Sequence, residues 1–200
     1  EGCPMKANHT MPSIVVVYHS GYGHTQRLAQ AVAQGAQAAL LQIDAQGILP
    51  ESAWMQLAAA DLIVLGSPTY MGSASWQFKK FADDSSAAWM TQQWKDKLFA
   101  GFTNSGSMSG DKLSTLQYFM TFAMQHSGLW VGTGMMPSNT KAALRNDLNY
   151  VGSSSGAMAT TPVDAGVDEV LEGDIETARR FGERLRDVAK RYTKASPHMA

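Results

Sequence analysis

Three short segments of the chain carry residues of the kinds that bind anions and flat rings. They are Ser20-Gly21-Tyr22-Gly23-His24-Thr25, Pro68-Thr69-Tyr70-Met71-Gly72 and Asn104-Ser105-Gly106-Ser107-Met108-Ser109. Glycines let backbone N–H groups approach a phosphate closely, and hydroxyl side chains add further donors. Hydrogen-bonding loops that also hold aromatic or polarisable side chains suit a planar heterocycle. One loop for a phosphate and two for a ring together predict a mononucleotide site.

The phosphate interpretation of the first segment has alternatives. No lysine follows its glycines, so it is not the loop of nucleoside-triphosphate enzymes, which requires Gly-Lys-Ser/Thr. It does contain Gly-x-Gly, and Asp44 stands where a dinucleotide fold keeps its ribose-binding acid. However, the third glycine position of that motif holds Gln26, which is too bulky for close helix–strand packing. A dinucleotide-binding dehydrogenase and a plain tight turn both remain open at this point.

Other residues with chemical potential stand outside these segments. His126 precedes Ser127-Gly128 at the end of a predicted helix, where an imidazolium would interact favourably with the helix dipole. His24 is either a phosphate partner or a polar turn residue. No group of His, Cys, Asp and Glu has metal-ligand spacing, so no metal site is predicted. Four tryptophans are predicted to pack in the core or between helices: Trp54, Trp76, Trp94 and Trp130.

The pattern of apolar residues predicts alternating strands and helices. Strands are expected at 14–18, 41–44, 62–65, 97–103 and 129–131, and helices at 26–39, 53–60, 75–88 and 112–125. A last amphipathic helix, capped by Asp174, runs from Ile175 to Tyr192. This alternation indicates a parallel sheet with helices on both faces, which binds ligands at the carboxyl ends of its strands. Residues 133–167, rich in Gly, Ser, Thr and Pro, are long enough to serve a site or an interface.

The composition excludes several classes of protein. The chain has 200 residues, 44% of them apolar, and a formal net charge of −1, which argues against disorder and against nucleic-acid binding. No apolar run approaches the length of a membrane span, and Cys3 is the only cysteine, so no intrachain disulfide can form. We expect a cytoplasmic domain over residues 12–194. Residues 1–11 are expected to be a tag remnant or disordered start, and residues 195–200 a frayed tail.

The three segments resemble those of flavodoxin-like proteins, and more closely those of the WrbA-type NAD(P)H:quinone oxidoreductases. The similarity extends from about Pro12 to Tyr192. It includes His126-Ser127-Gly128, where the family has His-x-Gly, and the glycine-rich segment Gly152–Thr161. The resemblance implies a three-layer α/β fold with a five-stranded parallel sheet in the order 2-1-3-4-5. As in flavodoxin itself, one FMN would bind where the strand order reverses.

The resemblance also assigns roles to residues. It places the FMN phosphate on Ser20–Thr25 and the ring between Pro68–Gly72 and Asn104–Ser109, with His126 close to the flavin. Trp89 would line the substrate side, and Tyr22 would lie near the nicotinamide of NAD(P)H. The implied activity is two-electron reduction of quinones by NAD(P)H in a homodimer or homotetramer. His126 would then supply a proton to the acceptor, unless it only stacks or caps its helix.

The chain also departs from this family. Where the family has Pro-Thr-Arg-Phe-Gly-Asn, this sequence reads Pro68-Thr69-Tyr70-Met71-Gly72-Ser73, and Met108 interrupts the glycine-rich stretch. These changes affect the quinone and nicotinamide side of the predicted site. Two other functions therefore stay open: a flavodoxin-type electron carrier and a flavin-bearing regulatory protein. Carriers usually present an acidic surface, which 17 acidic against 16 basic residues do not give overall.

Overall fold

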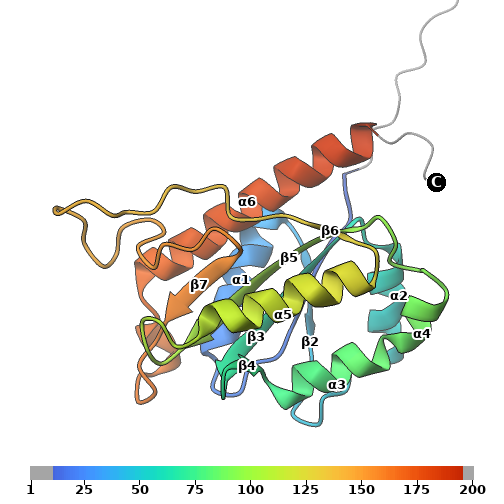
Figure 1. Ribbon diagram of the computed structural model, residues 1–200, viewed down its shortest axis with the longest axis horizontal. Coiled ribbons are helices and arrows are strands. Elements are labelled where there is room, and N and C mark those ends of the chain that lie inside the picture. The colour runs from blue at the N-terminus through green and yellow to red at the C-terminus, as the bar shows by residue number, and fades with distance from the viewer. Residues whose placement is uncertain (1–10, 196–200) are drawn as a thin grey trace, which may run out of the picture.

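The structure is a computed structural model that describes residues 11–195, and its centre is a parallel sheet (Figure 1). The sheet follows the order β2-β1-β3-β5-β6, which confirms the predicted order 2-1-3-4-5. Its strands are β1 (Ile14–Tyr18), β2 (Ala39–Gln42), β3 (Leu62–Tyr70), β5 (Leu98–Ser105) and β6 (Leu129–Trp130). Two short strands extend it: β4 (Ser73–Ala74) pairs antiparallel with β3, and β7 (Ala157–Thr160) pairs parallel with β5.

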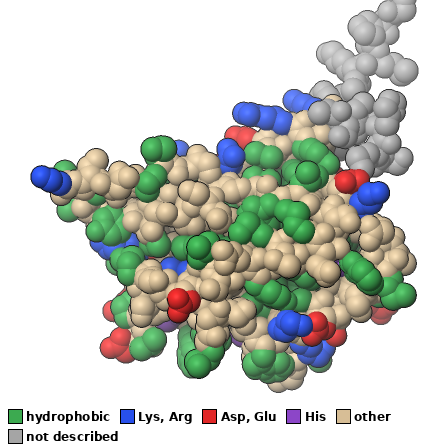
Figure 2. All heavy atoms as spheres, viewed as in Figure 1, with side chains coloured by type: hydrophobic (Ala, Val, Ile, Leu, Met, Phe, Trp, Pro, Cys, Tyr) green, Lys and Arg blue, Asp and Glu red, His purple; other side chains and the backbone are tan. Residues whose placement is uncertain are grey.

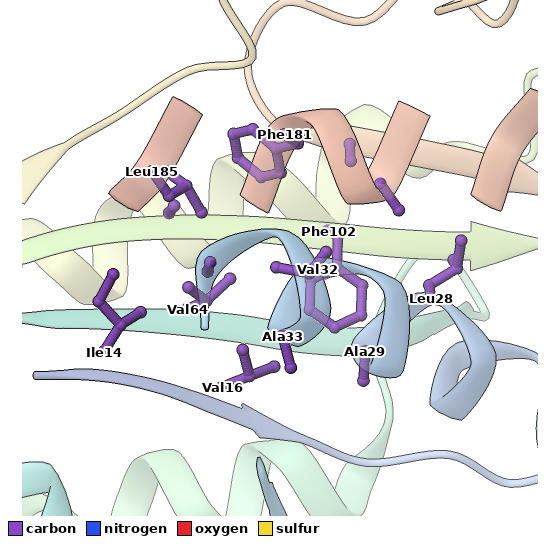
Figure 3. Close-up of a cluster of buried hydrophobic side chains, with 14 of the residues drawn as sticks. Ile14, Val16, Leu28, Ala29, Val32, Ala33, Val64, Phe102, Phe181 and Leu185 are labelled. Carbon is purple, nitrogen blue, oxygen red and sulfur yellow. The ribbon is translucent and has the colours of Figure 1, made fainter. Parts of the chain in front are cut away.

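Helices cover both faces of the sheet because alternate residues of its strands point to opposite sides. Ile14, Val16 and Tyr18 of β1 pack in one core with α1 (His24–Ala36) and α6 (Glu172–Ala195). Figure 3 shows Val32 of α1 beside Phe102 of β5, and Phe181 of α6 in the same cluster. The other core contains residues of α2 (Glu51–Ala59), α3 (Trp76–Asp84), α4 (Ser86–Met90) and α5 (Lys112–Gln125). The predicted α/β class, with helices on both sides, is thereby confirmed.

Several predicted boundaries differ from the structure. The helix predicted at 75–88 is two helices, separated at Ser85, whose Oγ donates to the carbonyl of Ala82 and competes with the helical backbone. Asp174 is not a cap but lies inside the first turn of α6, where its carboxylate binds Arg145. Trp94 is fully buried, as predicted for the packed tryptophans, whereas Trp76, which was predicted to pack in the same way, is 61% exposed.

The fifth strand of the sheet is divided. β6 pairs with the start of β5, at Leu98 and Phe99, and β7 pairs with its end, from Phe102 to Ser105. The chain between these two short strands projects from the molecule as a long loop (Figure 1). Strand β7 was not predicted, because its sequence Ala-Met-Ala-Thr has few of the β-branched and aromatic residues typical of strands. Its carboxyl end delivers residues 161–167 to the same edge of the sheet as the three predicted loops.

Some expectations concern residues beyond the described range. The proposed tag remnant falls almost wholly in residues 1–10, and the frayed tail in residues 196–200, outside what the structure describes. Within residues 11–195, no helix is both long enough and apolar enough to cross a membrane.

Candidate functional site

A cavity of about 280 Å³ opens at the carboxyl edge of the sheet. It lies where β1, β3 and β5 end, at the place where the strand order reverses. Four segments of the chain contribute to its lining. The lining residues are Tyr22, His24, Thr25, Pro68, Thr69, Tyr70, Asn104, Ser105, Gly106, Thr161 and Val163. The fold therefore brings the three sequence-predicted segments together and adds a fourth.

The loop between β1 and α1 is built to receive an anion. The Oγ of Ser20 accepts hydrogen bonds from the amides of Gly23, at 3.1 Å, and Gln26, at 3.2 Å, which curls the loop around this hydroxyl. Gly23 has a φ of 91°, a left-handed conformation that favours glycine. Among the described residues, the amides of Tyr22, His24 and Thr25 have no hydrogen-bond acceptor. These free donors at the start of α1 suit a phosphate.

The fourth segment, residues 161–167, closes one side of the cavity. The ring of His24 forms a hydrogen bond through Nε2 to the carbonyl of Ala165, at 2.9 Å. A side chain at Gly23 would collide with Val167, which shows how closely this segment packs on the loop. The hydroxyl of Thr161 donates to Oδ1 of Asn104 at 2.9 Å and so fixes the orientation of that amide. The segment therefore connects the phosphate loop to the third loop.

The opposite wall is the hairpin formed by β3 and β4. Tyr70 ends β3 and meets Tyr22 edge to face, with ring centroids 6.4 Å apart. A Cβ on Gly21 would lie 2.6 Å from the hydroxyl of Tyr70, so any other residue at this position would displace the Tyr70 side chain. Burial, and then the neighbouring Tyr22, raise the pKa of Tyr70, which keeps its phenol neutral. Two aromatic rings at the mouth of the cavity offer flat surfaces to a planar ligand.

The tip of this hairpin is a two-residue turn with an unusual sequence. Met71 and Gly72 have φ angles of 48° and 81°, as in the type I′ turns that favour Asn-Gly. Met71 is fully exposed and does not line the cavity. The sequence gave no sign that Met71 adopts this left-handed conformation, which methionine rarely occupies.

Hydroxyl groups form the floor beneath the cavity. The Oγ1 atom of Thr69 lies 2.8 Å from Oγ1 of both Thr103 and Thr115, which joins β3, β5 and α5. All three side chains are buried, and their hydrogen bonds hold the carboxyl ends of β3 and β5 against α5. Isolated threonines carry no motif, so this network could not be predicted from the sequence.

The predicted site residues of the three segments divide into those that line the cavity and those that do not. Nine of them line the cavity: Tyr22, His24, Thr25, Pro68, Thr69, Tyr70, Asn104, Ser105 and Gly106. Others belong to the same loops without lining it: Ser20, Gly21, Gly23, Met71, Gly72, Ser107, Met108 and Ser109. Thr161 and Val163 were missed as site residues, because the length of segment 133–167 and the family resemblance of Gly152–Thr161 did not show which side chains face the cavity.

The structure does not bring His126 or Trp89 to this cavity. Both residues line a separate cavity of about 400 Å³ between α3, α4 and α5. His126 follows the last residue of α5, whose 14 residues span about 21 Å from the pocket edge toward the opposite edge of the sheet. Within one chain, His126 is therefore not within reach of a ligand bound at the ends of β1, β3 and β5.

The surroundings of His126 resemble a core site. Its Nε2 lies 2.9 Å from Oγ of Ser85, and its ring lies against Trp94, with centroids 4.4 Å apart. The Nδ1 atom is buried without a partner among the described residues. Burial lowers the pKa of His126 to about 4, so the imidazole is neutral at pH 7. These contacts favour the packing interpretation over the proton-donor interpretation.

The main cavity fits a flavin mononucleotide. It offers free amides and the hydroxyl of Thr25 to a phosphate, and Tyr70, Asn104 and Ser105 to a ring with polar edges. Segment 161–167 packs directly against the phosphate loop, through Val167 beside Gly23 and the hydrogen bond between His24 and Ala165. Within residues 11–195, no group of three or more His, Cys, Asp or Glu side chains could hold a metal ion.

The fold and this cavity define a flavodoxin-like protein of the FMN-binding class. The family profile of NADPH-dependent FMN reductases matches residues 13–143, and the chain belongs to this family.

Two relatives are half identical to the chain. One is the flavodoxin FldP of Pseudomonas aeruginosa, 50% identical over 90% of this chain and 98% of the relative. The other is the crystal structure of the flavodoxin, WrbA-like protein from Agrobacterium tumefaciens, with a TM-score of 0.74 and 50% identity over 90% of this chain and 98% of that one. An NAD(P)H dehydrogenase (quinone) of Paracoccus denitrificans is 27% identical over 90% of this chain and 94% of the relative. The chain thus resembles both a flavodoxin and, more distantly, quinone-reducing enzymes.

Proposed function

We propose that the chain binds one FMN in the cavity at the ends of β1, β3 and β5 and transfers electrons from NAD(P)H to a quinone. The observation that carries this proposal is the convergence of the phosphate loop, the Tyr70 hairpin and the Asn104–Gly106 loop on one cavity. The free amides of Tyr22, His24 and Thr25 would hold the phosphate, and Thr161 would keep Asn104 oriented toward the ring. FMN would supply the redox chemistry, accepting a hydride and passing electrons to the acceptor.

His126 and Trp89 line a different cavity from the one proposed to bind FMN, so one chain does not bring them to its own flavin. If these two residues contact the flavin or the quinone, as the family resemblance implies, a second copy of the chain must supply them. The cavity that they line is open, with exposed Trp89 at its rim. The proposed quinone reductase is therefore a homodimer or homotetramer. Light scattering at working concentration tests this, and a monomer with quinone reductase activity would contradict the role of the second copy.

A flavodoxin-type electron carrier is the second candidate function. It is favoured by the 50% identity to flavodoxin FldP and by a cavity that one chain forms alone. A carrier needs neither His126 nor a second copy at the flavin. On the face seen in Figure 2, acidic and basic side chains are interspersed, so this face does not offer the acidic docking surface typical of many carriers.

One pair of assays separates the two candidates. Steady oxidation of NAD(P)H that depends on benzoquinone supports the enzyme. A radical signal that persists at half reduction in electron paramagnetic resonance, without NAD(P)H turnover, supports the carrier. Absence of any flavin affinity would overturn both.

A further inference from the structure

Lys112, the first residue of α5, is completely buried next to the cofactor cavity. Its Nζ donates to Oγ of Ser105 and the carbonyl of Ser107, each at 2.8 Å, and to the carbonyl of Met108 and Oγ1 of Thr160, each at 2.9 Å. All four acceptors are uncharged. Lysine is among the residues least often fully buried, and no carboxylate of residues 11–195 lies within hydrogen-bond distance of this one.

The charged groups near Lys112 leave its charge uncompensated. Asp174 faces it across Thr160, whose amide donates to Oδ2 of Asp174 at 2.9 Å. That carboxylate is already paired with Arg145, which donates to both of its oxygens at 2.7 and 2.6 Å. Two cations and one anion leave the cluster of Lys112, Arg145 and Asp174 with a net charge of +1. Burial lowers the pKa of Lys112 to about 8, so the ammonium remains the main form at pH 7.

The ammonium stands directly behind one wall of the cavity. Ser105, which accepts its hydrogen bond, lines the cavity, and so does Thr161, which follows Thr160. The same ammonium holds the carbonyls of Ser107 and Met108 and so shapes the loop that follows β5. A charge in a buried wall acts more strongly on a neighbouring ligand than a charge in water.

We infer that Lys112 is a positioning residue that raises the reduction potential of a flavin bound in this cavity. The inference rests on the proposed binding of FMN. Hydride transfer to a flavin adds two electrons and one proton, and therefore one negative charge. The fixed ammonium behind Ser105 attracts this added charge and stabilises the reduced cofactor more than the oxidised one.

The test compares Lys112→Met, which keeps most of the side-chain volume, with the exposed control Lys95→Met. Two quantities are measured on the flavin-loaded proteins: the Kd of oxidised FMN by fluorescence quenching and the midpoint potential by dye equilibration. We expect Lys112→Met to lower the potential by about 30 mV or more, a tenfold loss of preference for the reduced form. Lys95→Met should leave the potential unchanged.

A purely structural role gives a different result. If Lys112 only holds the loop, its loss weakens oxidised and reduced FMN equally, and the potential does not move; that outcome would overturn the inference. If Lys112→Met does not fold, Lys112→Gln, which keeps an N–H donor but no charge, takes its place with the same expected shift. Failure of the unsubstituted protein to bind FMN would defeat the proposed function, and this inference with it.

Discussion

The two ends of α5 each bury an ionisable side chain, and the two sites differ in what surrounds them. At the start of the helix, Lys112 is surrounded by four oxygens and keeps its charge beside the candidate site. At the other end, His126 has one hydroxyl partner, two aromatic neighbours and a pKa lowered to about 4. Burial lowers the pKa of both groups, Lys112 from 10.5 to about 8 and His126 from 6.5 to about 4, so only the lysine, with its higher ordinary pKa, remains charged at pH 7.

The carboxyl edge of the sheet, near Lys112, holds the candidate ligand site, whereas the opposite edge, near His126, is packed as part of the core. Substitutions at the pocket edge are expected to change ligand binding with little loss of stability. Substitutions around His126 are expected to lower stability with little change in ligand binding.

The substitution His126→Ala should destabilise the protein without weakening FMN binding. It removes a ring packed against Trp94 and Phe122 and leaves the hydroxyl of Ser85 with one partner fewer, so we expect a loss of about 2–4 kcal/mol in the free energy of unfolding. Urea unfolding measures the loss, and the exposed Gln125→Ala serves as control. The difference should shrink as the pH falls from 6.5 to about 4, because the folded state then binds the proton less readily than the unfolded state.

A different pair of results would show that His126 belongs to the ligand site. A tenfold or greater loss of FMN affinity with unchanged stability would show that His126 acts on the ligand. Unchanged quinone reoxidation rates in stopped flow, together with lower stability, would support its packing role.

The free energy of unfolding of the apoprotein should rise relative to Lys112→Met as the pH increases from about 8 to 10.5. In this range the folded protein has released the proton of Lys112, while the unfolded chain still binds it. The full difference is at most about 3 kcal/mol. Urea unfolding at several pH values checks it. Tyrosine ionisation, including that of Tyr118, affects both proteins alike and cancels. Parallel pH curves for the two proteins would contradict a buried ammonium at this position.

The substitution Thr25→Val should weaken FMN binding by about tenfold or more, because a hydrogen bond to a charged group contributes about 1.5–3 kcal/mol. Thr25 is buried at the start of α1 and its side chain lines the cavity, so valine fits the space but cannot donate. Riboflavin, which has no phosphate, is the matched control ligand and should bind both proteins equally. An equal loss for riboflavin would show that Thr25 contacts the ring and not the phosphate.

The substitution Met71→Asn should stabilise the protein by about 0.5–1 kcal/mol. Met71 has a φ of 48°, which asparagine adopts more easily than methionine. Thermal unfolding measures the gain. Met90→Asn, at an exposed methionine without a positive φ, should give none. A decrease in stability at Met71 would mean that its side chain has a role that its exposure does not reveal.

The sequence predicted most of the fold because the strands that matter are apolar and regular. Ile14–Tyr18 and Leu62–Leu65 are continuous apolar runs, as expected for strands covered on both faces, and helices between them require a parallel sheet. The strand predicted at 129–131 is confirmed by β6, but the second part of this divided strand, β7, could not be predicted, since it consists mainly of alanine and threonine. Their pairing with β5 depends on contacts between residues far apart in the sequence.

The candidate site was predictable where local sequence fixes local geometry. The glycines of the first loop and the hydroxyls around them carry their own signal, and the structure places Tyr22, His24 and Thr25 at the cavity. Lys112 and Val163 reach the site only through the tertiary fold and belong to no motif, whereas Thr161 ends the segment Gly152–Thr161 that resembles the family but was given no role in the site. The position of His126 was expected from family resemblance, which cannot say whether a residue acts within one chain.

The central claim is that this cavity holds one FMN, and titration of the apoprotein with FMN and with FAD by calorimetry tests it most directly. We predict one site per chain with a Kd for FMN of about 1 μM or lower, near −8 kcal/mol. FAD should bind at least tenfold more weakly, because Val167 and Ala165 pack against the phosphate loop, where the second phosphate and the adenosine of FAD would need space. Equal affinity for FAD, or no affinity for either flavin, would contradict the account.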